Sequence, residues 1–136
     1  MSLIKSHIYS RLYSATALEK PPVDIYKTVK ELHAELEGWK RGSPTLTEPI
    51  RKHTGGDFLF GFASIGLHFV YHNAVIMIHR VPIFLNYMVT ARKESEKVVS
   101  ISKAHALRSA AIGAQAARET LKVVNNMPWG DIAWTW

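Results

Sequence analysis

The longest apolar stretch of the chain runs from Phe58 to Pro82, and its first twenty-one residues contain no charged side chain. Asp57 can cap a helix that begins there, and Pro82 is expected to end it. The pattern predicts one long helix over about residues 58–80, which is either the centre of a helical bundle or a membrane span. Its polar side chains share one sector of about 100° of the helical wheel: Ser64, His68, Tyr71, His72 and His79.

The N-terminal segment predicts a short amphipathic helix. Ile4, Ile8 and Leu12 recur every four residues, which places them on one face of two to three helical turns. Pro21 and Pro22 are expected to end this helix.

The next segment, residues 24–41, predicts a longer amphipathic helix. Asp24 can cap its first turn, and Gly42 and Pro44 follow its last turn in the expected order. Residues 43–56 contain prolines and glycines without sustained periodicity, so they are expected to form a surface loop. The apolar positions of the helix alternate at spacings of four and three residues: Ile25, Val29, Leu32, Leu36 and Trp39.

A last helix is predicted from about Ser102 to Val124, after a charged segment, Thr90 to Lys103, that we interpret as a mobile surface connection. Because small side chains let two helices approach closely, we expect its apolar face to pack against the central helix. The tail over residues 127–136 holds three tryptophans, which should fold back on the core or belong to an element that the chain cuts short. The face itself keeps a strict three-four spacing: Leu107, Ala110, Ala114, Ala117, Leu121 and Val124.

The fold class predicted from these patterns is all-α. A chain of 136 residues is about one domain, and neither a strand alternation nor an internal repeat is visible. We therefore expect a bundle of about four to five helices around the central apolar helix.

Composition narrows the classes of function. Seventeen Lys and Arg against eleven Asp and Glu give a net charge of +6, but the basic residues form pairs and not a run, which gives little support to a nucleic-acid surface. The absence of cysteine excludes disulfides, cysteine nucleophiles, Fe-S clusters and thiolate zinc sites within this chain.

His68 and His72 are four residues apart, a spacing that lets two imidazoles face one metal ion or ligate haem. Against a metal site, no Asp or Glu lies between Asp57 and Glu94, and His79 is about two turns away. A membrane cytochrome is a further alternative, because the stretch meets the length of about 20 residues that a span needs, although no second stretch of this length exists. The interpretation that we favour is that the imidazoles form hydrogen bonds inside a helical core.

No catalytic residue is predicted. Ser64 lies near His68 and His72 on a helix, but no acid is available to orient an imidazole and no nucleophile-elbow motif surrounds the serine. The chain is therefore not expected to be an enzyme.

Four sequence blocks together resemble the fungal-specific transcription factor domain, the regulatory or middle homology region of fungal binuclear zinc cluster regulators. They are IYSRLYSA, TVKELHAELEGWKRGSP, LHFVYHNAVIMIHRVPIF and AQAARETLKVV, which follow one another in the family's order. The chain departs from the family pattern at Val81, which separates Arg80 from Pro82. The matching positions are Leu36, Trp39, Pro44, Leu67, His68, Tyr71, His72, His79, Arg80, Ala116, Ala117 and Arg118.

The resemblance implies that residues 1–136 are a single regulatory domain fragment, the central portion of a longer all-α domain in a nuclear protein. It implies control of an activation domain, in some members in response to a small metabolite, through other parts of the parent transcription factor. Zinc is expected only in a separate DNA-binding domain, so this chain should hold no cofactor or metal and make no specific DNA contact.

If a ligand pocket exists, its expected lining is the polar sector of the central helix, Ser64, His68, Tyr71, His72 and His79. The alternative is that these side chains only hold neighbouring helices in register. For the whole chain, the alternatives are a helical protein-interaction or scaffold domain without a transcriptional role, or a His-ligated metal or haem protein. No membrane partner is expected, whereas the Ala-rich face and the tryptophan tail predict a homodimer or poor solubility.

Overall fold

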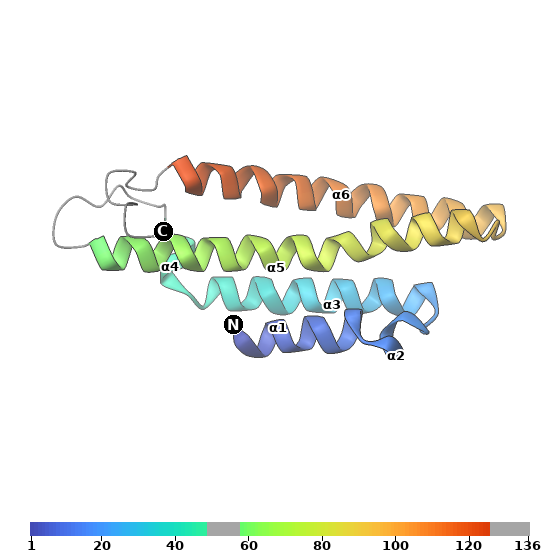
Figure 1. Cartoon of the computed structure of the whole chain (residues 1–136), viewed down its shortest axis with the longest axis horizontal. Helices are drawn as coiled ribbons and strands as arrows, with labels where there is room; N and C mark the ends of the chain where they lie inside the picture. The colour runs from blue at the N-terminus through green and yellow to red at the C-terminus, as the bar shows by residue number, and fades with distance from the viewer. Residues whose placement is uncertain (49–57, 126–136) are drawn as a thin grey trace, which may run out of the picture.

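The computed structural model describes residues 1–48 and 58–125, and every regular element in these ranges is a helix. The predicted all-α class is therefore confirmed. Four elements, α1, α3, α5 and α6, run side by side in that order with alternating direction (Figure 1). The elements are α1 (Ser2–Ile8), a π-helical segment (Tyr9–Tyr13), α2 (Ala15–Leu18), α3 (Pro22–Arg41), α4 (Pro44–Thr47), α5 (Phe58–Ala91) and α6 (Glu96–Asn125).

The central helix α5 is longer than predicted. It continues through Pro82 to Ala91, so the prediction that Pro82 ends the helix was wrong. Proline removes one backbone hydrogen bond and its ring crowds the preceding turn. Here that ring is fully buried, and the apolar side chains on both sides of it, Ile78 and Val89, are buried as well. Packing against the neighbouring helices therefore holds the helix together across the proline. The predicted cap, Asp57, lies outside the described residues.

Helices α5 and α6 are joined by a turn of four residues, 92–95. The mobile connection predicted up to Lys103 was wrong, because α6 begins at Glu96. The turn is closed by Lys93 in the left-handed region, with a φ of 52°. The Ser95 hydroxyl accepts a hydrogen bond from the amide of Val98 at 3.4 Å and so caps the first turn of α6. α5 and α6 consequently form an antiparallel hairpin.

Helix α3 has the face that its sequence predicts. Its apolar positions pack into the core, and the tryptophan at its end is half-buried. The start differs from the prediction: Pro21 is the N-cap residue and Pro22 opens the helix, whereas Asp24 lies in the first turn and does not cap it. Proline suits this position because its missing amide would have no helical partner anyway.

The hydrophobic core lies between α1, the π-helical segment, α3 and α5, with α4 closing one end. Side chains from α1 that were predicted to share a face do so. Helix α6 adds only one residue to this cluster, because most side chains on the face that it turns to α5 are small. The buried cluster comprises Ile4, Ile8, Leu12, Ile25, Val29, Leu32, Leu36, Leu46, Tyr71, Ala74, Val75, Ile78, Val81 and Ala116.

Helix α6 does pack against α5, but not with the predicted face. Leu107 and Leu121 are 63% and 65% exposed, and the alanines between them on the predicted face are exposed too. Small residues occur on most of the circumference of α6, so apolar spacing alone could not select the buried face. Polar contacts inside the interface, described below, favour the face that the structure shows. The buried residues are Ser102, Ala106, Ser109, Ala116 and Val123.

One stretch of the described chain, Gly61–Ala91, is long and apolar enough to cross a membrane by length and composition. In its most apolar window 39% of the residues are buried inside the structure. The core helix of a bundle satisfies the same criterion, so this single helix is weak evidence for a span.

The position of the core gives a direct stability test. Leu32 has no exposed surface, whereas Leu3 is 65% exposed. Leu32→Ala should lower the free energy of unfolding by about 2–5 kcal/mol because it leaves a cavity. The matched control Leu3→Ala should change it by less than about 0.5 kcal/mol. Urea unfolding followed by circular dichroism measures both, and equal losses would contradict this assignment of the core.

Candidate functional site

Three residues of the polar sector of α5, Tyr71, His72 and His79, face a groove between α3 and α6. Two adjoining hollows of about 250 and 240 Å³ make up this groove, and both are lined by His33 of α3 and Ile112 of α6. We call it the His33 groove. Its further lining residues are Tyr26, Val29, Lys30, Glu37 and Lys40 of α3, Tyr71, His72, Val75, His79 and Pro82 of α5, and His105, Arg108, Ser109, Gln115, Ala116 and Glu119 of α6.

At one end of the groove, Tyr71 connects α5 to α3. Its hydroxyl donates a hydrogen bond to Oε1 of Glu37, and Nζ of Lys40 lies 4.8 Å from the centre of its ring. Burial raises the pKa of Tyr71 well above its usual range, and the carboxylate of Glu37 raises it further. The tyrosine therefore stays protonated as a donor, beside one cation and one carboxylate that a ligand can reach.

His68 and His72 lie on successive turns of α5, with ring centres 6.3 Å apart. Burial lowers the pKa of both imidazoles; for His72 the charge of His68 is the next cause, and the charge of Lys40 lowers both further. Both rings are therefore neutral at pH 7. Nε2 of His68 is buried and has no hydrogen-bond partner among the described residues.

His79 links all three helices of the groove. Its Nδ1 lies 3.0 Å from Oγ of Ser109 on α6, and its Nε2 lies 3.0 Å from Nδ1 of His33 on α3. Burial, as the main cause, and the charge of the nearby His33 ring, as the second cause, together lower the pKa of His79 to about 4. A neutral imidazole can donate through one nitrogen and accept through the other, so His79 can serve both partners at once.

A second contact connects α3 directly to α6. The rings of Tyr26 and His105 are stacked, with centres 3.9 Å apart and planes at 9°. This pair closes the end of the groove near the start of α3. The width of the groove is thus held by aromatic and imidazole contacts and not by large aliphatic side chains.

The structure separates the five predicted lining residues into three groups. Tyr71, His72 and His79 line the His33 groove. His68 lies one turn before His72, beside the groove, whereas Ser64 is buried but lines none of the described hollows.

The contributions of α3 and α6 to the groove were not predicted from the sequence. His33, Glu37 and Lys40 follow one another at four and three residues, so they share one face of α3, next to its apolar seam. Ile112, Gln115 and Glu119 do the same on α6. Each stripe is visible in the sequence, but only the tertiary arrangement shows that the two stripes face each other.

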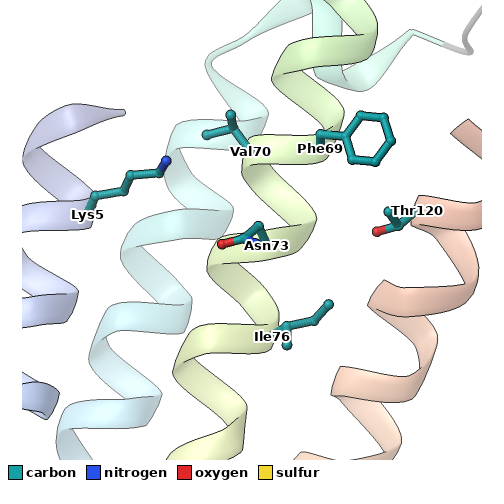
Figure 2. A pocket seen from close by; sticks show the side chains of 6 residues that line it. All are labelled: Lys5, Phe69, Val70, Asn73, Ile76 and Thr120. Carbon is teal, nitrogen blue, oxygen red and sulfur yellow. The ribbon is translucent and has the colours of Figure 1, made fainter. Parts of the chain in front are cut away.

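Another hollow, of about 320 Å³, lies on a different side of α5, between α1 and α6 (Figure 2). Its lining has no imidazole and no carboxylate, and Lys5 is its one ionisable side chain, so we regard the His33 groove as the stronger candidate for specific recognition. Figure 2 shows its lining residues: Lys5, Phe69, Val70, Asn73, Ile76 and Thr120.

A metal centre has little support. Among residues 1–48 and 58–125 there is no group of three or more His, Cys, Asp or Glu side chains that could hold a metal ion. Within these ranges the pair His68 and His72 has no third protein ligand of the kind that a zinc site requires.

Comparison with known proteins gives relatives among fungal regulators. The chain is 29% identical, over 137 aligned residues and 98% of its length, to an ABC-transporter-regulating transcription factor of Aspergillus fumigatus. It is also 29% identical, over the same share of its length, to the protein of the same description from Aspergillus oryzae. The chain spans 15% of the length of each relative. No family model matches the sequence, and no solved structure matches it.

The similarity covers all the helices of the groove, because 98% of the chain is aligned. Both relatives are named as transcription factors, and the comparisons indicate no enzyme family. The region of the relatives that the chain matches is a small part of much longer proteins.

The buried imidazole of His79 predicts a pH dependence of stability. Above pH 6.5 His79 is neutral in both the folded and the unfolded chain. Between pH 6.5 and about 4 the unfolded chain binds a proton at His79 that the folded chain does not, so the free energy of unfolding falls as the pH falls. His79→Gln keeps a hydrogen-bonding side chain but cannot titrate.

In this variant the loss of stability across that pH window should shrink by up to about 3 kcal/mol. Urea unfolding at pH 7.5, 6, 5 and 4.5 measures the loss. Some slope should remain, because burial also lowers the pKa of His68 and His72. Identical losses for wild type and variant would show that His79 does not titrate in this window.

Proposed function

We propose that this chain is a regulatory module of a fungal transcription factor, which controls the activity of an activation domain and does not itself contact DNA. The observation that carries the proposal is the similarity to two transcription factors along 98% of the chain. Because both relatives are named as regulators of ABC transporters, the proposal extends to control of ABC-transporter genes. A nuclear location follows from this role.

The architecture supports a regulatory role in place of a DNA-binding role. The chain has no cysteine to hold a zinc cluster, and its tightest basic groups in sequence are pairs, such as Lys40 with Arg41 and Arg92 with Lys93. Specific DNA recognition needs several basic side chains arranged along one surface. We therefore assign DNA contacts, and any zinc, to parts of the parent protein outside these 136 residues.

We further propose that the His33 groove binds a small-molecule effector. The groove offers apolar walls, from Val75 and Ile112, together with a few converging polar groups, which is the usual make-up of a small-molecule site. Lys40 and the neutral imidazole of His72 are suited to hydrogen-bond acceptors on the ligand, and Glu37 is suited to donors.

The groove is also placed where a ligand can change the packing of the bundle. Its walls belong to three different helices, and one imidazole, that of His79, bridges all of them. A ligand that binds one spacing of α3 and α6 more tightly than another shifts the population of the two packings by its difference in affinity. The change in packing then alters the contacts of any part of the parent protein that packs against these helices.

A scaffold without a transcriptional role is the second candidate. The observation that favours it is the apolar surface that the described helices leave exposed, for example at Leu107 and Tyr87. Such surfaces mark contacts with other proteins or with other parts of the same protein. The following reporter experiment separates the two candidates.

The regulatory role is tested by inserting residues 1–136 between an unrelated DNA-binding domain and an acidic activation domain in a fungal host. We expect reporter expression several-fold below that of a fusion with an unstructured linker of equal length. Leu32→Ala, which disrupts the core, should restore expression. Expression equal to that of the linker fusion, with and without added metabolites, would favour the scaffold.

The effector site is tested by thermal shift and calorimetric titration of the purified chain against a panel of fungal metabolites and apolar xenobiotics. A compound that binds wild type should bind His72→Ala at least about tenfold more weakly, which corresponds to about 1.4 kcal/mol. The matched control is Asn73→Ala, because Asn73 is the next residue and lines the other hollow. Equal binding by all three proteins, or binding by none, removes the groove from the proposal.

A further inference from the structure

The exposed face of α6 carries a continuous apolar stripe. Leu107 and Leu121 are mostly exposed, the alanines between them are exposed, and Val124 is half-buried. Alternating spacings of three and four residues characterise helices that pair along a coiled-coil seam. We call the stripe the α6 seam: Leu107, Ala110, Ala114, Ala117, Leu121 and Val124.

We propose that the α6 seam binds the α6 seam of a second copy of the chain, in an antiparallel pair with two-fold symmetry. In such a pair both copies use the same patch. Each contact between two different residues is therefore made twice, once from each copy. This inference does not depend on the proposed function, since it follows from the described residues of α6.

The sizes of the seam residues fit this partner. With the two-fold axis between Ala114 and Ala117, Leu121 of each copy faces Ala110 of the other, and Leu107 faces Val124. Large side chains thus meet small ones, and the alanines at the centre let the two backbones approach closely. A parallel pair would place Leu on Leu at both ends and three layers of Ala on Ala between them, which leaves a void in the middle.

The charges fit the antiparallel pair as well. The chain carries a net charge of +6, so like charges brought together at an interface would oppose association. Arg118 lies beside the seam, on a flank that in the antiparallel arrangement faces the same flank of the second copy, where Arg118 comes near the uncharged Ala111. In a parallel pair Lys103, which lies four residues before Leu107 in line with the seam, would meet its own counterpart.

The surface next to the seam adds area to the contact. Thr120 lines the hollow shown in Figure 2, and Ala117 and Val124 lie three residues before it and four after it, on the same face of α6. A second helix on the seam therefore also approaches the apolar side chains of α5 in that hollow, Phe69 and Ile76. The seam is about 27 Å long, and this added surface brings the contact toward the roughly 800 Å² per partner of a stable interface.

Sedimentation velocity of the purified chain tests the pairing. We expect wild type to be a dimer at micromolar concentrations. Ala114→Glu and Ala117→Glu each place two carboxylates at the centre of the pair, so each should weaken dimerisation at least a hundredfold and give a monomer. Both alanines are exposed in the single copy, so the helix content seen by circular dichroism should not change.

The matched control is Ala104→Glu, which makes the same change at an exposed position of α6 that lies about a third of a turn away from the seam. This variant should remain dimeric. A monomeric wild type overturns the proposal and leaves the seam to a different partner. A dimer that resists both seam variants, or that is lost equally in Ala104→Glu, overturns it too.

The direction of the pair is tested with a nitroxide on Lys103→Cys, which is a single labelling site because the chain has no other cysteine. The antiparallel pair separates the two labels by about 25 helical residues, or roughly 38 Å along the helix axis. A parallel pair would bring them to roughly 10 Å. A pulsed dipolar measurement that gives the short distance overturns the antiparallel arrangement.

Discussion

The need to cover α5 is the constraint on which the rest of the structure depends. This helix has 34 residues, and Arg80 is its only charged side chain. A helix that is apolar on nearly every side must be covered by other elements. In the described chain, α3 covers one side with large aliphatic side chains and α6 covers another with small ones. The remaining side stays partly open, which is why the molecule has both a hollow beside α1 and exposed aromatic residues.

The way in which α6 covers α5 depends on one polar contact. Serines at buried positions cost free energy unless they find hydrogen-bond partners. Ser109 meets this requirement through His79, which in turn reaches His33 on the far wall of the groove. This chain of contacts, together with the stacking of Tyr26 on His105, favours the rotation of α6 that the structure shows. The rotation decides which residues line the groove and which face outward. The candidate ligand site and the candidate dimer surface are therefore two consequences of the same contact.

The sequence was most informative where large apolar residues occupy a single face. No other face of α3 carries large apolar side chains comparable to those of Leu32 and Leu36, so the buried face of that helix could be predicted. Helix α6 has small residues all round, and its inward serines look no more apolar than its outward alanines, so the wrong face was chosen. Similarly, Pro82 carries a strong local signal to end a helix, and only burial within the fold overrides it.

For the candidate site, the residues on α5 were recognisable because they interrupt an apolar stretch. Their counterparts on α3, such as His33, look like ordinary surface residues until the helices are brought together.

Pro82 also gives α5 a point of mechanical weakness. Because proline has no amide hydrogen, the carbonyl of Ile78 has no donor four residues later, and the ladder of hydrogen bonds is interrupted there. Beyond this point the tip of the α5–α6 hairpin projects past the start of α3 (Figure 1). Bending at Pro82 thus costs less than bending elsewhere along the helix. Since Pro82 also lines the His33 groove, a molecule held in the groove would lie next to the point at which α5 bends most easily.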